Sequence, residues 1–382
     1  MKLIRQIEVY APEYLGKKDV LICGGKTEWI RDEIRMEDEA CEVIDGTGKM
    51  LVPGLIDQHV HITGGGGEGS FHTKAPEVNL SALVRGGITT VVGLLGTDGI
   101  SRNVENLLSK AKALKEEGIS CYICTGSYGY PSVTITGDVK KDIAFIDEVL
   151  GVKLAISDHR APNITVDILI SLASDVRTAA MLSGKPGIVT LHMGDDKRGL
   201  KPVFEALERT SIPIKTFRPT HVSRNPQLLE QAFAYAKMGG YIDITAGQTG
   251  TSAVECIRAA RELHVPFENI TFSSDGQGSW SNYDKEGHLL EIGVSSVSSL
   301  YEELVHLVQE GGLSLSEALP FMTSQVAAAL ELGQKGQIRE GADADLVILN
   351  QDMTMDSVLA MGRLMMEHGQ VKVWGTYESR DL

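Results

Sequence analysis

Eight short apolar runs dominate the middle of this sequence and restrict the folds it can adopt. They are Leu55–His61, Ile88–Leu95, Ile119–Thr125, Val152–Ile156, Ile188–His192, Ile214–His221, Tyr241–Thr245 and Ile270–Asp275. Stretches with apolar residues at helical spacing separate many of them: Arg102–Glu117, Val166–Leu182, Leu200–Glu208, Gln227–Lys237 and Ala253–Leu263. Strands that alternate with helices form parallel sheets, and eight such units close a barrel. The sequence therefore predicts an α/β fold built on a (β/α)8 TIM-type barrel.

The two ends of the chain have a different pattern. Residues 1–50 and 336–382 contain short alternating runs, such as Leu3–Val9, Val20–Cys23, Leu346–Ile348 and Val371–Trp374. We expect these ends to form one small β-sandwich domain beside a barrel of residues 51–335. Asp343 and Asp345 in the second end are candidate metal ligands. Carboxylates at turns and strand boundaries are usually structural, however, and we favour that interpretation.

Charge and hydropathy exclude several classes of partner. The chain has 36 Lys+Arg against 51 Asp+Glu, a net charge of −15. It has no basic tract, so nucleic acid and anionic membranes are not expected partners. No apolar run is long enough to span a bilayer and no secretory signal is visible, which predicts a cytoplasmic protein.

The cysteines fit a reducing compartment, since five is an odd number in a long chain. Cys121 and Cys124 form a C-x-x-C pattern that could serve redox chemistry or zinc binding. They lie in an apolar strand-like run, where positions i and i+3 face opposite sides. We therefore favour buried thiols.

A cluster of potential metal ligands follows the predicted strands. His59 and His61 end the first run, and residues i and i+2 of a strand share one face. Neutral imidazoles are good zinc ligands. His192, His221 and Asp275 end or follow later runs, and a TIM barrel gathers the ends of its strands at one rim. A single strand-end histidine would be weak evidence, but the set predicts a metal site. The other histidines receive no role: His72, His159, His264, His288, His306 and His368.

The order and strand placement of these residues resemble the amidohydrolase superfamily. The resemblance rests on Lys153 at the fourth strand, on His192, His221 and Asp275, and on the segment Pro53-Gly54-Leu55-Ile56-Asp57-Gln58-His59-Val60-His61. Within that superfamily, β-aspartyl (isoaspartyl) dipeptidases are similar along nearly the whole chain. That similarity is carried by the loop Gly64–Glu68, the segment at Tyr128 and the run Gly151–Arg160.

The resemblance implies two divalent metal ions per subunit, expected to be zinc. It assigns one ion to His59, His61 and Asp275 and the other to His192 and His221. Lys153 would bridge them as an N6-carboxylated lysine, because a desolvated neutral amine can react with carbon dioxide. A hydroxide between the two cations would then be the nucleophile.

The resemblance also implies roles for residues near the strand ends. Asp275 would act as general base and then general acid, and Tyr128 would stabilise the oxyanion and contact the substrate. Glu68 would receive a substrate ammonium, and Arg160 and Arg224 would receive carboxylates. Ser279 and Thr97 would add further substrate contacts. Such a set fits a small zwitterionic dipeptide.

The predicted function is metal-dependent hydrolysis of β-aspartyl dipeptides. One alternative is a cyclic-amide hydrolase of the same superfamily, similar to dihydroorotase or hydantoinase, for which an ammonium pocket would have no use. Another is a non-catalytic scaffold on the same fold, which would not need an intact ligand set. The resemblance further implies a homo-oligomer. The sequence does not determine whether the loops at residues 69–76 and 280–287 close over a substrate.

Overall fold

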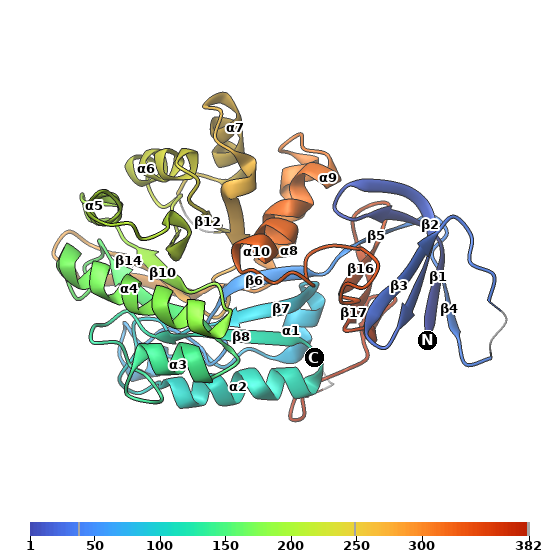
Figure 1. The fold of residues 1–382 in the computed structure, drawn as a ribbon, viewed down its shortest axis with the longest axis horizontal. Helices are drawn as coiled ribbons and strands as arrows, with labels where there is room; N and C mark the ends of the chain where they lie inside the picture. Colours follow the sequence, from blue (N-terminus) through green and yellow to red (C-terminus); the bar gives the residue numbers. More distant parts are fainter. Residues whose placement is uncertain (37–38, 248–249, 380–382) are drawn as a thin grey trace.

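A computed structural model describes residues 1–36, 39–247 and 250–379 (Figure 1). The central sheet has eight parallel strands in sequence order: β6 (Leu55–Val60), β7 (Ile88–Gly93), β8 (Ser120–Gly126), β9 (Val149–Ile156), β10 (Ile188–Met193), β11 (Phe217–Thr220), β12 (Ile242–Thr245) and β13 (Ile270–Ser273). A bridge between Val60 and Gly276 joins the end of the last strand to the first. The predicted barrel is confirmed.

The helices lie between and after the barrel strands: α1 (Leu80–Arg85), α2 (Val104–Glu117), α3 (Val139–Phe145), α4 (Val166–Ser183), α5 (Lys201–Arg209), α6 (Pro226–Lys237), α7 (Ala253–Glu262), α8 (Ser299–Gln309), α9 (Leu315–Ala318) and α10 (Ser324–Ala329). The five predicted helices are present, and their largest boundary difference is a start at Val104 rather than Arg102. Asn103, Thr165, Asn225 and Ser252 cap helix starts by accepting hydrogen bonds from backbone amides. No helix in the described part of the chain is both long and apolar enough to cross a bilayer.

One predicted strand is shorter than its apolar run. Residues Ile214–Thr216 form a 3₁₀ turn directly before β11. Ile214 packs against the main core from this turn. Its apolar character therefore reflects packing and not pairing in the sheet, a distinction that the sequence pattern does not make.

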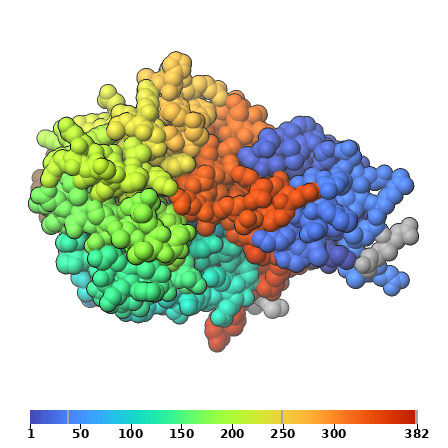
Figure 2. Space-filling view, viewed as in Figure 1, coloured from blue at the N-terminus to red at the C-terminus, as the bar shows by residue number. Residues whose placement is uncertain are grey.

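Both ends of the chain join in one nine-stranded sheet. Its strands are β1 (Lys2–Tyr10), β2 (Tyr14–Cys23), β3 (Lys26–Arg31), β4 (Glu42–Asp45), β5 (Lys49–Pro53), β16 (Leu346–Asn350), β17 (Met355–Ala360), β18 (Arg363–Glu367) and β19 (Gln370–Val371). The antiparallel pairing of β5 with β16 joins the two ends. Figures 1 and 2 show this terminal sheet at one side of the barrel. The expected second domain is thus confirmed as a sheet domain with its own apolar core.

The last predicted run, Val371–Trp374, is only partly a strand. β19 ends at Val371, and the indole of Trp374 lies under the guanidinium of Arg85, 5.2 Å from the ring centroid. The amides of Lys372 and Val373 still donate to the carbonyl of Met365 in β18, and Trp374 then lies against α1 through this cation–π contact.

An antiparallel hairpin outside both sheets was not anticipated. It consists of β14 (Ser279–Tyr283) and β15 (Leu289–Val294) and directly follows the barrel. Trp280 lies opposite Gly293, where an added Cβ would come within 2.2 Å of the indole. This hairpin contains the residues after Ser279 that the sequence left unassigned.

The two cysteines of the C-x-x-C pattern are buried in β8. They belong to different apolar clusters, as expected for positions on opposite faces of a strand. Both are free thiols, and burial raises the pKa of each. The expectation of inert core thiols is confirmed.

A buried ion cluster connects the barrel with the terminal sheet. The ammonium of Lys335 lies 2.8 Å from a carboxylate oxygen of Asp343 and 2.6 Å from one of Asp345. It also donates to the hydroxyl of Ser120 in β8 at 2.6 Å. Burial tends to lower the pKa of Lys335, but the two carboxylates outweigh it and raise that pKa. Asp343 and Asp345 are therefore structural, as favoured from the sequence.

Replacement of Lys335 by methionine is expected to lower the free energy of unfolding by about 3–5 kcal/mol, because it removes the ammonium that pairs with the buried carboxylate of Asp345 and leaves Asp343 with Lys26 alone. Urea denaturation measures this change. Lys215→Met is the control, since Lys215 pairs with Glu331 at an exposed surface, and it should cost less than about 1 kcal/mol. Equal losses in the two variants would contradict the structural role of the cluster.

Candidate metal centre and active site

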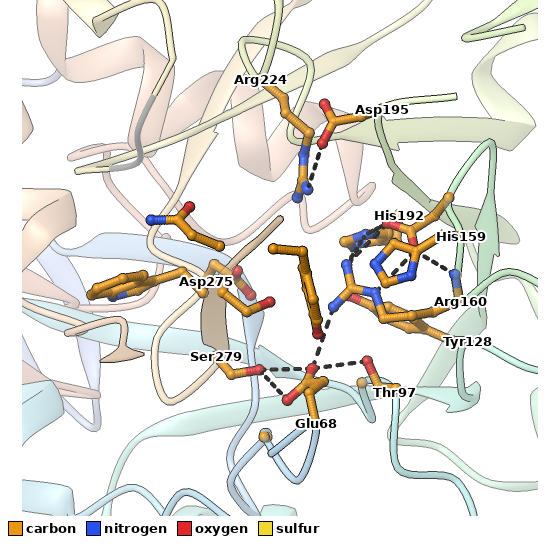
Figure 3. Close-up of a pocket in the computed structure, with 18 of the residues that line it drawn as sticks. Glu68, Thr97, Tyr128, His159, Arg160, His192, Asp195, Arg224, Asp275 and Ser279 are labelled. Atoms are coloured by element: carbon orange, nitrogen blue, oxygen red, sulfur yellow. Dashed lines mark hydrogen bonds and ion pairs between the residues drawn. The ribbon is translucent and has the colours of Figure 1, made fainter. Parts of the chain in front are cut away.

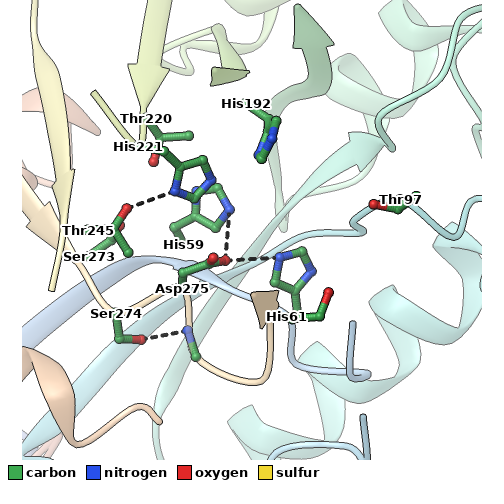
Figure 4. A network of polar contacts seen from close by, with 12 residues as sticks. His59, His61, Thr97, His192, Thr220, His221, Thr245, Ser273, Ser274 and Asp275 are labelled. Atoms are coloured by element: carbon green, nitrogen blue, oxygen red, sulfur yellow. Dashed lines mark hydrogen bonds and ion pairs between the residues drawn. The ribbon is translucent and has the colours of Figure 1, made fainter. Parts of the chain in front are cut away.

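Four of the predicted metal ligands meet at the carboxyl end of the barrel (Figure 4). One carboxylate oxygen of Asp275 lies 3.5 Å from Nε2 of His59 and 3.1 Å from Nε2 of His61. The rings of His59 and His221 are 5.0 Å apart between centroids. Donor atoms of His59, His221 and Asp275 lie within 4.8 Å of one another, which is close enough for a shared ion.

Lys153 and His192 complete the predicted set. Lys153 is fully buried in β9, and its Nζ lies 3.0 Å from Nε2 of His59. Burial lowers the pKa of Lys153 to about 7, so the neutral amine is accessible near neutral pH. His192 is the penultimate residue of β10, with its ring centroid 4.6 Å from that of His221. The structure therefore brings all six predicted ligands together.

The backbone is strained where two of these residues leave their strands. His221 has a φ of 62° and Asp275 a φ of 52°, in the left-handed region that residues other than glycine rarely adopt. Such conformations concentrate at functional sites, where the surrounding structure holds them. Gly96 adds a packing constraint, since a Cβ there would come within 2.9 Å of the His61 ring.

The donor set fits divalent metal ions. Burial lowers the pKa values of His59, His192 and His221 well below the usual range, so these rings are neutral and can act as ligands. The buried Nδ1 atoms of His59 and His61 have no hydrogen-bond partner among the described residues. Nδ1 of His221 lies 2.8 Å from the hydroxyl of Thr245, an arrangement that orients an imidazole ligand.

His192 is the exception, because both of its ring nitrogens already have partners. Its Nδ1 lies 2.6 Å from the hydroxyl of Tyr128 and its Nε2 lies 3.0 Å from a carboxylate oxygen of Asp158. Metal binding by His192 requires one of these two contacts to open.

A cavity of about 920 Å³ opens above the cluster (Figure 3). Its volume is near the upper end of the range for small-molecule sites. Every predicted substrate residue contributes to its lining, namely Glu68, Thr97, Tyr128, Arg160, Arg224 and Ser279. The β14–β15 hairpin supplies much of another wall. Tyr283 from this hairpin packs edge-on against His159, with ring centroids 5.0 Å apart.

Glu68 is held in the cavity wall by two hydroxyl groups. It follows a glycine loop in which Gly64 has a φ of 80° and an added Cβ there would collide with the carbonyl of Ala75 at 2.1 Å. Thr97 donates to a carboxylate oxygen of Glu68 at 3.0 Å, and Ser279 donates to both oxygens at 2.9 Å. Thr97 and Ser279 thus contact a protein carboxylate, and their expected contact with a substrate stays a prediction.

Arg160 lies between Glu68 and a carboxylate that received no role from the sequence. One guanidinium nitrogen lies 3.3 Å from Glu68. Two others donate to separate oxygens of Asp158, each at 2.9 Å. Burial opposes charge on Asp158, but His192 and Arg160 outweigh it and hold the pKa of Asp158 far below its usual range. This fork-to-carboxylate pairing fixes the plane of the guanidinium.

Tyr128 and Arg224 also face the cavity. Burial raises the pKa of Tyr128, which keeps its hydroxyl protonated and able to donate. Figure 3 shows Arg224 across the cavity from Glu68, next to Asp195. Its nearest ion-pair distance to Asp195 is 3.8 Å, and its buried Nε has no hydrogen-bond partner within the described ranges. Arg224 therefore has donors left for an anionic ligand.

Comparison with known proteins agrees with this geometry. Residues 50–365 match the profile of the amidohydrolase family. The chain belongs to this family. A β-aspartyl dipeptidase of Fervidobacterium islandicum AW-1, solved in complex with the dipeptide β-Asp-Leu, is 44% identical to this amidohydrolase. The match covers 97% of this chain and 98% of that one, with a TM-score of 0.93.

Two further similar proteins are named as a dihydroorotase and a D-hydantoinase. A dihydroorotase of Listeria monocytogenes serotype 4a is 26% identical, over 90% of this amidohydrolase and 87% of that protein. A D-hydantoinase (dihydropyrimidinase) of a Thermus species covers 99% of this chain and 98% of its own, at 18% identity and a TM-score of 0.71. That likeness shows the shared fold. Family membership makes this protein a hydrolase, and the residues gathered at its barrel rim are candidate metal ligands.

Sequence reasoning missed two parts of the site. The run Gly151–Arg160 carries part of the family resemblance, but it assigns no role to Asp158, although an acid two residues before an arginine can signal a local ion pair. No sequence pattern indicates that Tyr283 forms part of the cavity wall, because its partner His159 comes from a loop that is far away in sequence.

Proposed function

We propose that this amidohydrolase is a metal-dependent β-aspartyl dipeptidase. The pair formed by Glu68 and Arg160, 3.3 Å apart in the cavity wall, is the observation that carries the proposal. A β-linked aspartyl residue keeps its α-ammonium and its α-carboxylate on the same carbon. Adjacent carboxylate and guanidinium groups are complementary to that head group. In an α-linked aspartyl residue the α-carbonyl belongs to the peptide bond, so the match is lost.

The rim residues would hold two divalent ions, proposed to be zinc. His59, His61 and Asp275 would hold one ion, His192 and His221 the other, and a carboxylated Lys153 would connect them. Bound there, the ions would supply Lewis-acid activation of the amide and of a water molecule.

Side chains of the protein would transfer the proton and stabilise the negative charge that develops during the reaction. The carboxylate of Asp275 would accept a proton from the attacking water and deliver it to the leaving nitrogen. The hydroxyl of Tyr128 would donate a hydrogen bond to the oxygen of the scissile carbonyl as negative charge develops there. Arg224, with its unused donors across the cavity, would bind the second carboxylate of the dipeptide.

The similarity to a dipeptidase solved with β-Asp-Leu supports this proposal. The similarity to dihydroorotases at 26% identity favours cyclic-amide hydrolysis as the second candidate. A dihydroorotate ring carries a carboxylate but no ammonium, so it would make no use of the Glu68 carboxylate that lies beside Arg160 in the cavity wall. The cytoplasmic location and homo-oligomeric assembly expected from the sequence remain predictions.

One experiment separates the two reactions. Protein supplied with zinc and bicarbonate is incubated in parallel with β-Asp-Leu and with dihydroorotate. We expect release of aspartate and leucine from the dipeptide and no ring opening. Ring opening without dipeptide cleavage would support the dihydroorotase activity instead, and no turnover of either compound would favour a scaffold.

A further inference from the structure

Asp158 links the metal cluster to the substrate pocket. Its side chain is only 2% exposed. One oxygen accepts from the Arg160 backbone amide at 2.7 Å and from the Arg160 Nε at 2.9 Å. The other accepts from an Arg160 terminal nitrogen at 2.9 Å and lies 3.0 Å from Nε2 of His192. Both oxygens of this carboxylate therefore have hydrogen-bond partners.

The local backbone places Asp158 in this position. Ser157 immediately before it has a φ of 53°, a left-handed turn that ends β9. Gly194 after β10 leaves the space beside it, since a Cβ there would come within 2.4 Å of the Asp158 Cα. A strained turn and a glycine contact both serve to seat one buried carboxylate, which indicates a specific role.

The arrangement of Asp158, Arg160 and Glu68 determines which charges are available to a ligand. Arg160 lies between two carboxylates, with a two-pronged contact to Asp158 and a single longer contact to Glu68 at 3.3 Å. Because Asp158 already balances the charge of Arg160, Glu68 keeps its own charge for another cation. Without Asp158, the nearest described anion for Arg160 would be Glu68, the same group that a substrate ammonium requires.

We propose that Asp158 is a positioning residue for substrate binding. It holds the Arg160 guanidinium in place for a carboxylate and prevents it from neutralising Glu68. This inference rests on the proposed dipeptidase function and deepens it, since it explains how neighbouring groups of opposite charge both stay available to a zwitterionic head group.

The test is a double-mutant cycle on β-Asp-Leu hydrolysis. The variants are Asp158→Asn, Arg160→Met and the double variant, each with its zinc content measured. Asp158→Asn should raise KM about tenfold or more with a smaller fall in kcat, because it weakens one partner of a buried charge pair. In the Arg160→Met background the same change should alter KM by less than about threefold, since coupled residues are not additive.

Asp196→Asn is the matched control. Asp196 accepts from the backbone amide of Arg198 at 2.8 Å and from its Nε at 3.3 Å, the same local pattern, but it is partly exposed and outside the cavity lining. It should leave KM and kcat at wild-type values. A general effect of breaking an Asp-x-Arg contact would appear in this variant too.

Two outcomes would overturn the positioning role. One is full additivity of Asp158→Asn and Arg160→Met. The other is a loss of zinc in proportion to activity at unchanged KM, which would show that Asp158 acts on His192. Should Asp158→Asn not fold, Asp158→Glu replaces it, and a KM at the wild-type value in that variant would contradict fine positioning. The dipeptidase proposal fails separately, if wild-type protein in the same assay leaves β-Asp-Leu intact.

Discussion

Replacing Glu68 by glutamine should lower kcat/KM for β-Asp-Leu by about 10²- to 10³-fold, because a substrate ammonium loses its buried counter-charge. Glutamine is isosteric, and its amide oxygen can still accept from Thr97 and Ser279, which now bond the carboxylate. The loop should therefore keep its shape. Steady-state kinetics with zinc-loaded protein measures the loss.

Two comparisons make that result specific. Glu105→Gln, on the exposed side of α2, should have wild-type kinetics. The zinc content of Glu68→Gln should equal that of the wild type, since Glu68 is not among the proposed ligands. Unchanged turnover of β-Asp-Leu by Glu68→Gln would show that the amine does not bind at this carboxylate.

Replacing Lys153 by alanine should remove zinc and activity together, with kcat/KM down by more than about 100-fold, because metal affinity depends on each ligand and its supports. Lys153 is fully buried, so the shorter side chain leaves a space beside His59. A small carboxylic acid such as acetate could occupy that space and replace the carbamate oxygens. Partial recovery of both zinc content and activity with acetate is the expected result.

Lys153→Met is the matched variant for this rescue. Methionine fills the buried space without offering an oxygen or nitrogen ligand, so zinc and activity should stay low whatever acid is added. Zinc content by elemental analysis and initial rates are measured on the same samples. Full activity of Lys153→Ala without any added acid would contradict a bridging role for this lysine.

The barrel was predictable because local patterns determine it. Apolar runs such as Leu55–His61 and Ile270–Asp275 are buried on both faces, and amphipathic helices such as α4 show their period directly. The predicted ligands also follow from position, since parallel strands place their carboxyl ends at one rim. His59, His192 and Asp275 could therefore be grouped before any distance was known.

Other features depend on contacts that no local pattern reveals. The β14–β15 hairpin is half exposed and adds little to the core, so its strands lack a clear apolar period. The pairing of Lys335 with Asp343 and Asp345 depends on the path of the chain between them. The sequence therefore favours a structural role for these two acids without identifying their partner. Trp374 ends a short alternating run and therefore resembles a strand residue. Its contact with Arg85, which is distant in sequence, cannot be seen in that local pattern.

Linkage selectivity tests most directly whether Glu68 and Arg160 bind the head group of a β-linked substrate. Zinc-loaded wild-type protein is given β-Asp-Leu and α-Asp-Leu at equal concentrations in separate reactions, and leucine release is followed. Rapid cleavage of the β-linked dipeptide with little or no cleavage of the α-linked one is predicted. Equal rates for the two isomers, or faster cleavage of the α-linked one, would contradict it.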